Sequence, residues 1–565
     1  MDASTPRQRY IKRLGALKSE RSTWIDHWRE LSEYVRPRKA KFFTTDTNNG
    51  AKQHRSIING TPIRASRILA SGMMAGISSP ARPWFRLTTA DAALAEYGPV
   101  KDWLHIVESV LREKLQKSNL YNCLHQVYEN LIVFGTQPLH IEEDVRRGFR
   151  GYVFPVGQYC LANSAQLEVN TVYRELRMTV AQAVERFGLQ RCSNRLRQLY
   201  ERQELDQWVD VLHVLEPNRD AEPGRPGPRG MAWRSCWLEV SAAEGDGPTF
   251  LREGGFEEFP VMAPRWAVSG EDVYGESPGM EALGDAKALQ LIEKRKAQAV
   301  DRVVNPPMRG PSALRGQQVS LLPGAVTYVD AIHPGQSFAP AIELHPSAIP
   351  AIDGLGREHE LRINQAFMAD LWMSLARADG KMTATEVMER HEEKMLQLGP
   401  VMERLQNELL DPMISRCFNI GLRNRWFPPP PEELQGQEAR VEYLSIMAQA
   451  QKMLGITGVE RFVSFVGSVA AGVGPDVLDK LDADQVVDEY GNMLGIPPSI
   501  VRPDEAVEAI RAKRAQVAQA QQAIATAGAV AEGAKTLSQA DTGGDNALTR
   551  LMHGLSGVAA GGLPQ

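Results

Sequence analysis

The stretch YGESPGMEALGD, from Tyr274 to Asp285, decides how the fold of this chain is interpreted. Its GESPG segment matches G-x-S-x-G, the turn that carries the nucleophilic serine of many hydrolases. In that turn the backbone N–H of the residue after the serine stabilises the oxyanion, and here that residue is Pro278, which has no N–H. A helix start explains the same residues, with Ser277 as the N-cap, Pro278 at the first helical position and Glu281 in the first turn.

Beyond Pro278 the sequence predicts two long helices separated by a small excursion. A helical period covers residues 278–304 and stops before Pro306 and Pro307. Loop and strand character follows over residues 305–346, and the helical period returns over residues 347–373. We expect such an arrangement where an excursion has to be held far from the main body.

The N-terminal part, residues 1–277, is predicted to contain helices followed by a β-rich region. Small residues in Gly72-Met-Met-Ala-Gly76 indicate that another segment packs closely on one of these helices. Short runs rich in Val, Tyr and Phe, separated by Gly and Pro, then predict strands. Together with the long helices they predict an α+β fold that is mainly helical.

The C-terminal part begins with a polar loop, residues 374–382. Thr383 and Glu386 have the spacing of a capping box and start a helix, which prolines at 400 and 412 are expected to kink. This segment extends to residue 437, and alanine-rich helical sequence follows over residues 438–530. The last residues, 531–565, form a low-complexity tail.

No residue set in the sequence supports catalysis, metal binding or cofactor binding. Gly380-Lys381-Met382-Thr383 lacks the Ser or Thr that follows the lysine in a phosphate-binding loop. No H-E-x-x-H is present, and the five cysteines are scattered without a C-x-x-C pair. We therefore expect no catalytic residue, no metal site and no cofactor.

Charge and hydropathy give weaker signals. The net charge is −5, but residues 1–60 hold thirteen Lys or Arg against six Asp or Glu. A solvated basic face or an anionic partner explains this excess. The uncharged stretch Phe462–Gly474 is shorter than the roughly 20 residues of a membrane span, and we interpret it as a buried core helix. No secretory signal is visible, so we expect synthesis in the cytoplasm and no membrane partner.

Several stretches resemble, in order, the portal (head-to-tail connector) proteins of short-tailed bacteriophages. The first is RASRILASGMMAGISSPARPWFRL, which begins at Arg64. It is followed by NTVYRELRMTVAQAVERFG, VLHVLEPN, EEFPVMAPRW, the YGESPGMEALGDAK stretch and KMTATEVMER. The resemblance covers most of residues 20–430.

The resemblance implies a ring of twelve copies around a channel at one capsid vertex. The implied domains are a wing (1–277), stem helices (278–304 and 347–373), a clip (305–346), a tunnel loop (374–382), a kinked wing helix (383–437), a crown (438–530) and a tail (531–565). The implied partners are double-stranded DNA, the terminase motor, the capsid protein, a tail adaptor and internal core or scaffolding proteins. The protein would belong to the virion and be made in the cytoplasm of the host bacterium.

The implied mechanism is a conduit for DNA, in which no bond is made or broken. Because each phosphate contact adds affinity, many contacts would slow the passage of DNA. Arg377 and Lys381 in the tunnel loop are candidates for transient phosphate contact, or they cap helices or bridge subunits. On the first stem helix Lys294, Arg295 and Lys296 are weaker candidates, since consecutive residues point in different directions and bridges between subunits are the alternative.

Two other functions remain open at this stage. One is another ring protein of the capsid vertex or a tail adaptor, and the other is a nucleic-acid enzyme of the packaging machinery. The order of long helix, clip and long helix counts against the first. The missing phosphate-binding loop counts against the second.

Overall fold

The computed structural model describes residues 5–37, 42, 57–91, 94, 97–242, 245–309, 339–340, 345, 347–376, 399–434, 439–443, 446–474, 480–494, 502 and 504–538. The chain divides into two compact units, which are described separately. One contains Met1–Ala95 and Asp102–Gly458, and the other contains Glu96–Lys101 and Val459–Gln565. The described residues form a mainly helical fold with several sheets, so the predicted α+β class is confirmed.

The N-terminal helices are α1 (Pro6–Tyr34), α2 (Thr61–Ile77), α4 (Gly98–Lys117) and α5 (Leu120–Phe134). Helix α1 starts at a capping box in which Thr5 and Gln8 satisfy each other's backbone N–H groups. Its Trp28 is fully buried and donates a hydrogen bond of 2.9 Å from Nε1 to the carbonyl of Phe134. The start of the chain is thereby attached to the end of α5.

The β-rich region contains a three-stranded sheet and a five-stranded sheet, both antiparallel. The smaller has the order β3 (Gly148–Val153), β2 (Leu139–Asp144) and β9 (Val261–Met262). The larger has the order β4 (Tyr159–Asn163), β5 (Val169–Thr179), β6 (Trp208–Pro217), β7 (Trp233–Glu239) and β8 (Arg252–Phe256). Short helices lie between the strands: α6 (Val180–Phe187), η1 (Leu189–Arg191), α7 (Asn194–Glu201) and η2 (Pro228–Gly230).

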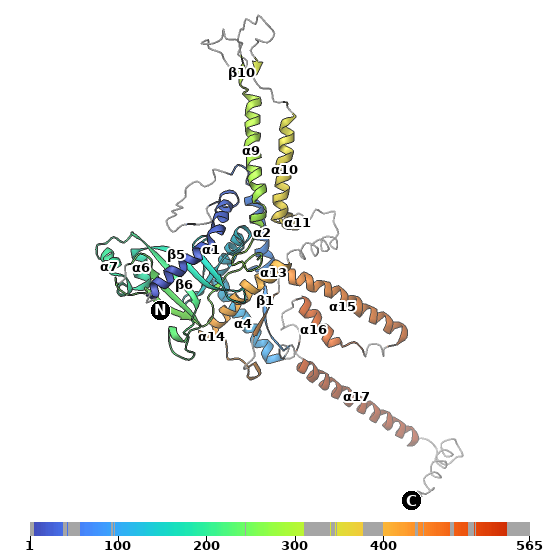
Figure 1. Ribbon diagram of the computed structural model, residues 1–565. Helices are drawn as coiled ribbons and strands as arrows, with labels where there is room; N and C mark the ends of the chain where they lie inside the picture. The colour runs from blue at the N-terminus through green and yellow to red at the C-terminus, as the bar shows by residue number, and fades with distance from the viewer. Residues whose placement is uncertain are drawn as a thin grey trace. The chain divides into compact units, whose positions relative to one another are not determined.

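Both faces of the five-stranded sheet carry buried side chains, because successive residues of a strand point to opposite faces. Tyr173 of β5 belongs to a cluster with Leu14 and Leu17 of α1. Met178, also on β5, belongs to a second cluster with Phe187 of α6. Helices of the same chain therefore pack on both faces of the sheet (Figure 1).

The elements after the sheets are α8 (Pro278–Glu281), α9 (Leu283–Val304), β10 (Met308–Arg309), β11 (Ala339–Pro340), α10 (Ala348–Ala366) and α11 (Ala369–Ala376). Helices α9 and α10 lie side by side, and β10 pairs with β11 (Figure 1). Neither predicted long helix is continuous. Ala282 separates α8 from α9, and the second helix breaks at Met368, whose φ of +50° is left-handed.

Helix α13 (Gly399–Leu405), the π-helical turn η4 (Gln406–Leu410), α14 (Asp411–Arg423) and η5 (Glu432–Leu434) follow. Pro412 lies in the first turn of α14, directly after the π-helical turn. Proline lacks an N–H and its ring collides with the carbonyl four residues earlier, which accounts for the irregular turn. The prediction of a helix from residue 438 is wrong for Ala439–Tyr443, which form strand β12. Its Val441 lies opposite Leu87 of β1 (Phe85–Thr89).

The C-terminal helices are α15 (Ile446–Val473), α16 (Ala483–Leu494) and α17 (Asp504–Ser538). The Phe462–Gly474 stretch lies almost wholly in α15, but Phe462 and Phe465 are 56% and 64% exposed. The prediction of a buried core helix is therefore wrong for these side chains. Among the described residues no helix is long and apolar enough to cross a membrane.

Candidate functional site

The candidate site is the α9/α10 pair and its root, defined as residues 274–279 and the end of α5. At the root the Ser277 hydroxyl donates a hydrogen bond of 2.7 Å to the carbonyl of Val133. The same oxygen accepts one of 3.2 Å from the backbone N–H of Met280, and Pro278 is in the first turn. The Ser277 oxygen therefore caps the start of a helix, and its proton attaches that helix to the buried carbonyl at the end of α5.

The root also depends on two backbones that approach closely. Gly135 ends α5 with a φ of +78°, and a Cβ built there would lie 1.9 Å from the carbonyl oxygen of Gly275. A Cβ on Gly279 would lie 2.7 Å from the carbonyl oxygen of Val133. Only glycine fits these contacts, and at Gly135 it also provides the left-handed conformation. Tyr274 is buried beside them and packs edge-on against Trp28, with ring centroids 5.3 Å apart.

The lower part of the pair is attached to the segment before α2. Oε1 of Gln290 on α9 accepts hydrogen bonds from the backbone N–H groups of Ile58 and Asn59, at 2.7 and 2.9 Å. Nε2 of Gln290 donates to the carbonyl of Asn59 at 2.9 Å. The Asn59 side chain in turn donates to Glu360 of α10 at 2.7 Å. One buried glutamine and one asparagine thus connect α9, α10 and the start of α2.

Polar contacts run along the pair and show that α9 and α10 are antiparallel. Near the root His359 Nδ1 lies 2.7 Å from Oδ1 of Asp285. Further out Lys296 of α9 pairs with Asp353 of α10. Between them Gly356 is buried against Ile292, and a Cβ there would be in ordinary contact at 3.7 Å. An alanine would therefore fit at this position without moving the helices apart.

The three consecutive basic residues of α9 have different surroundings. Lys296 faces α10, and its bond with Asp353 raises the pKa of the ammonium group. Lys294 and Arg295 are exposed and form no ion pair with another described residue. Arg302 lies seven residues beyond Arg295 and on the same side of α9, whereas Lys294 points about 100° away. The i, i+7 spacing of Arg295 and Arg302 could have revealed this basic pair, which the sequence analysis did not single out.

Trp372 of α11 explains the small residues of α2. Its indole covers Gly72, where a Cβ would lie 2.2 Å from the ring, and Gly76, where it would lie 3.2 Å away. The segment that packs closely, as expected for the small residues, is therefore α11. The candidates Arg377, Lys381, Thr383 and Glu386 lie outside the described residues.

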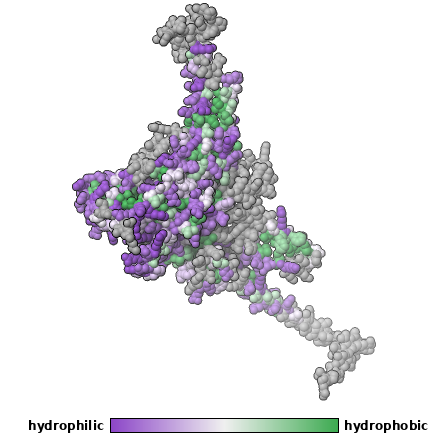
Figure 2. All heavy atoms as spheres, in the orientation of Figure 1, coloured by the Kyte–Doolittle hydropathy of each residue, from purple (hydrophilic) through white to green (hydrophobic). Residues whose placement is uncertain are grey.

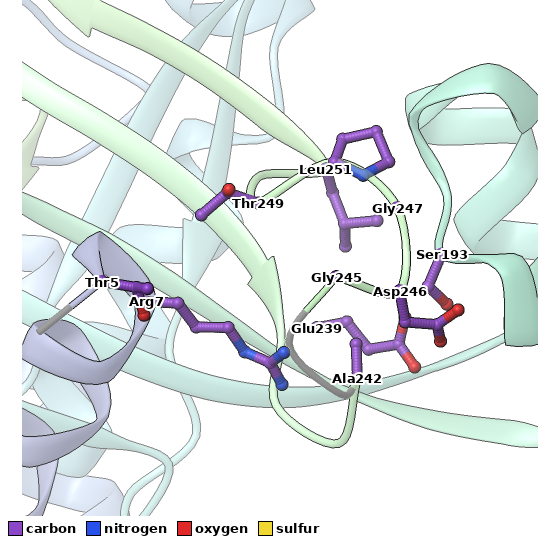
Figure 3. Close-up of a pocket in the computed structure, with 11 residues that line it drawn as sticks. Thr5, Arg7, Ser193, Glu239, Ala242, Gly245, Asp246, Gly247, Thr249 and Leu251 are labelled. Carbon is purple, nitrogen blue, oxygen red and sulfur yellow. The ribbon is translucent and has the colours of Figure 1, made fainter.

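A small cavity beside the start of α1 carries polar side chains. The cavity, of about 120 Å³, is lined by Arg7 of α1 and by Ser193, Glu239 and Asp246 (Figure 3). Burial raises the pKa of Glu239, while Ser193 is occupied as the N-cap of α7, with its oxygen accepting from Leu196 N–H.

The five cysteines are buried and unpaired. Burial raises the pKa of Cys123 and of Cys160 to about 11, so both are neutral thiols at pH 7. Within the described part of the chain no group of three or more His, Cys, Asp or Glu side chains could hold a metal ion.

These observations define the class of the protein, which is a mixed α/β chain with a β-rich body. An antiparallel helix pair starts at this body, and the chain leaves along α9 and comes back along α10. A family model described as "Bacteriophage head to tail connecting protein" matches residues 7–501. The chain belongs to this family. Its role is that of a structural connector at the junction of phage head and tail, and it is not an enzyme.

Two relatives agree with this assignment. The chain is 44% identical over 565 residues to the "Portal protein" of Salmonella phage epsilon15, with full coverage of both chains. It is 43% identical over 558 residues to the "Probable portal protein" of Bordetella phage BPP-1, covering 99% of this chain and 100% of the relative. Among solved structures, the "Neck of empty GTA particle computed with C6 symmetry" is 12% identical with a TM-score of 0.34, covering 72% of this chain and 86% of the other.

Proposed function

We propose that this protein is a portal subunit, twelve copies of which form a ring around a channel for double-stranded DNA. DNA enters the capsid through the ring during packaging and leaves through it during ejection. The proposal rests on the portal proteins that match along the whole chain, and on the α9/α10 pair, which has the form of a stem.

The observation that carries the ring is the apolar surface of the stem. Leu291 of α9 is 48% exposed, and Leu355 and Leu361 of α10 are 53% and 54% exposed. Figure 2 shows apolar side chains at the surface of this helix pair. Single exposed leucines are ordinary, but several on one pair of packed helices indicate a surface that another chain covers. Neighbouring copies of the same stem are the occupants that a closed ring supplies.

Two positions in such a ring suit the exposed basic residues of α9, Lys294, Arg295 and Arg302. Those that face the channel would contact passing phosphates without the many contacts that would slow DNA. Those that face a neighbouring copy would pair with that copy's acidic residues. Lys296 is excluded from both roles as long as it keeps its bond with Asp353.

The remaining segments are assigned in the same proposal. Residues 1–277 and 383–437 form the wing, 278–304 and 347–373 the stem, and 438–530 the crown, followed by the tail (531–565). The clip, residues 305–346, would lie at the far end of the stem, where the terminase motor and later the tail adaptor would dock. Wing and crown would meet the capsid protein and internal core or scaffolding proteins, at one vertex of a virion made in the host cytoplasm.

The tunnel loop, residues 374–382, would carry the transient DNA contacts through Arg377 and Lys381, next to a helix capped by Thr383 and Glu386. Replacing both basic residues by alanine should leave the ring assembled but change DNA packaging or retention in particles. If the double variant fails to assemble, the two residues are contacts between subunits and not with DNA.

Negative-stain images of the purified full-length protein test the ring. We expect roughly twelvefold rings with a central hole. Leu355→Glu should reduce the ring fraction by about tenfold, since a buried charge opposes assembly, whereas Leu355→Met should preserve it. A wild-type monomer that hydrolyses ATP when DNA is added would contradict the proposal.

A further inference from the structure

A second and larger pocket, of about 630 Å³, lies at one end of the five-stranded sheet. Helix α1 forms one wall through Arg9, Tyr10 and Arg13. The other wall combines the β4–β5 turn with the start of the β6–β7 loop, where Arg219 lies. Its volume is in the range of pockets that hold a small ligand or a short stretch of peptide.

Three arginines give this pocket an excess of positive charge. Arg9 and Arg13 are one helical turn apart on the same face of α1, and Arg219 faces them from the loop. None of the three forms an ion pair with another residue in the described ranges. By contrast, Arg234 in the same lining is neutralised by Glu253 at 2.7 Å.

The loop that presents Arg219 is held in place by its own hydrogen bonds. The Asn218 side chain donates to the carbonyl of Met231 at 2.9 Å, and its backbone N–H donates to the carbonyl of Ala232 at 2.8 Å. Glu222 N–H donates to the carbonyl of Arg229 at 2.8 Å. The pocket is therefore preorganised, which lowers the entropic cost of binding.

The polar lining also offers hydrogen-bond acceptors. Oδ1 of Asn163 is buried and has no hydrogen-bond partner within the described part of the chain, although the residue lines the pocket. Glu216, which accepts a 2.8 Å bond from the Tyr173 hydroxyl, and Asp220 add negative charge. A ligand must therefore bring both an acidic group for the arginines and N–H donors for these oxygens.

We propose that this pocket binds an acidic segment of a partner protein. Its Asp or Glu carboxylates would pair with Arg9, Arg13 and Arg219, since guanidinium binds carboxylate with two parallel hydrogen bonds. Its backbone N–H groups would reach Asn163. A DNA backbone brings phosphates but no N–H donors for Asn163. The inference does not depend on the ring or on the channel.

The test uses the assembled full-length protein and a fluorescent peptide of alternating glutamate and glycine, measured by fluorescence anisotropy at low salt. Arg13→Gln combined with Arg219→Gln should weaken peptide binding by about tenfold or more, because two charge-assisted contacts are lost. Arg225→Gln is the matched control in the same loop, because Arg225 pairs with Glu222 at 2.5 Å and does not line the pocket. It should change binding by less than about twofold.

Two further probes decide the class of ligand. A peptide with glutamine in place of glutamate should bind far more weakly, and a thymidine oligonucleotide of matching length should not depend on Arg13 and Arg219. Three results would overturn the proposal. They are no binding of the acidic peptide, equal binding of the glutamine peptide, and oligonucleotide binding with the same arginine dependence.

Discussion

The five-stranded sheet and the α9/α10 stem place their apolar side chains differently. The sheet is covered on both faces by helices of the same chain, and residues such as Leu212 and Val211 are fully buried. In the stem the buried apolar residues of α9 other than Ala299 lie near the root, while Leu355 and Leu361 of α10 are exposed.

The difference shows which part of the chain can be stable alone. A body whose core is closed within one chain keeps its stability at any concentration. In the proposed ring, a stem held mainly by polar contacts along its length and by packing at its root would gain its remaining stability from association. The body would therefore behave as a scaffold, and the stem as the part that assembly completes.

The largest expected effect comes from breaking the joint between the two regions. Gly135→Ala introduces a Cβ 1.9 Å from the carbonyl of Gly275 at a left-handed residue. Strain and overpacking together should lower the free energy of unfolding by roughly 2–5 kcal/mol, measured by denaturant titration.

Gly270→Ala is the matched control for this variant, because Gly270 has a φ of +58° but nothing within 4 Å of its Cβ position. It should cost only about 1 kcal/mol from backbone strain. If both variants lost the same free energy of unfolding, Gly135 would not be needed for the close approach of the two backbones at the root.

An intermediate effect is expected from acid on the body. Burial lowers the pKa of His140 and, together with the neighbouring His140, lowers that of His213 well below its ordinary value. Arg174 and Arg186 also oppose a positive charge on His213, whereas Glu142 is bonded to His140 and favours it. Both rings stay neutral in the folded body at pH 7.

The sign of the pH dependence follows from these directions. Because the folded pKa lies below the unfolded one, the stability is fully present above about pH 6.5 and is lost as the pH falls below it. Each histidine can remove up to about 1.4 kcal/mol per pH unit. Urea titrations between neutral and mildly acidic pH should show this slope, and His213→Gln should reduce it. A slope that stays the same in that variant would contradict the assignment.

The smallest effect is expected from the polar contacts along the stem. Lys296→Met removes the pair with Asp353, whose two side chains are each 31% exposed. Exposed ion pairs contribute little, so the melting temperature and the ring fraction should be unchanged within error. A clear fall in either would show that the stem depends on its internal ion pairs and not on association.

Some of this architecture could be predicted from local sequence. Pro278 after Ser277 indicates a helix start by local chemistry, and that geometry is found at the root. The small residues Gly72 and Gly76 likewise predict, from local chemistry, that another segment packs closely on α2. Nothing local says that the neighbour is Trp372, because that contact joins residues far apart in the chain.

Other features could not be predicted because they depend on distant partners. The ARVEY segment of β12 is short and lies between a proline run and a long helix, and it becomes a strand by pairing with β1. Likewise, the left-handed Met368 ends α10 where Phe367 becomes buried, and no glycine marks that position. The different surroundings of Lys294, Arg295 and Lys296 follow from where α10 lies.

The central claim is that neighbouring copies complete the stem, and hydrogen–deuterium exchange tests it most directly. Exchange would be measured on the ring and on the monomer of the full-length protein, separated by size-exclusion chromatography. We expect the amides of α10 and the outer half of α9 to exchange at least about tenfold more slowly in the ring, while those of β5, β6 and β7 do not change. Equal exchange of α9 and α10 in the two forms would contradict it.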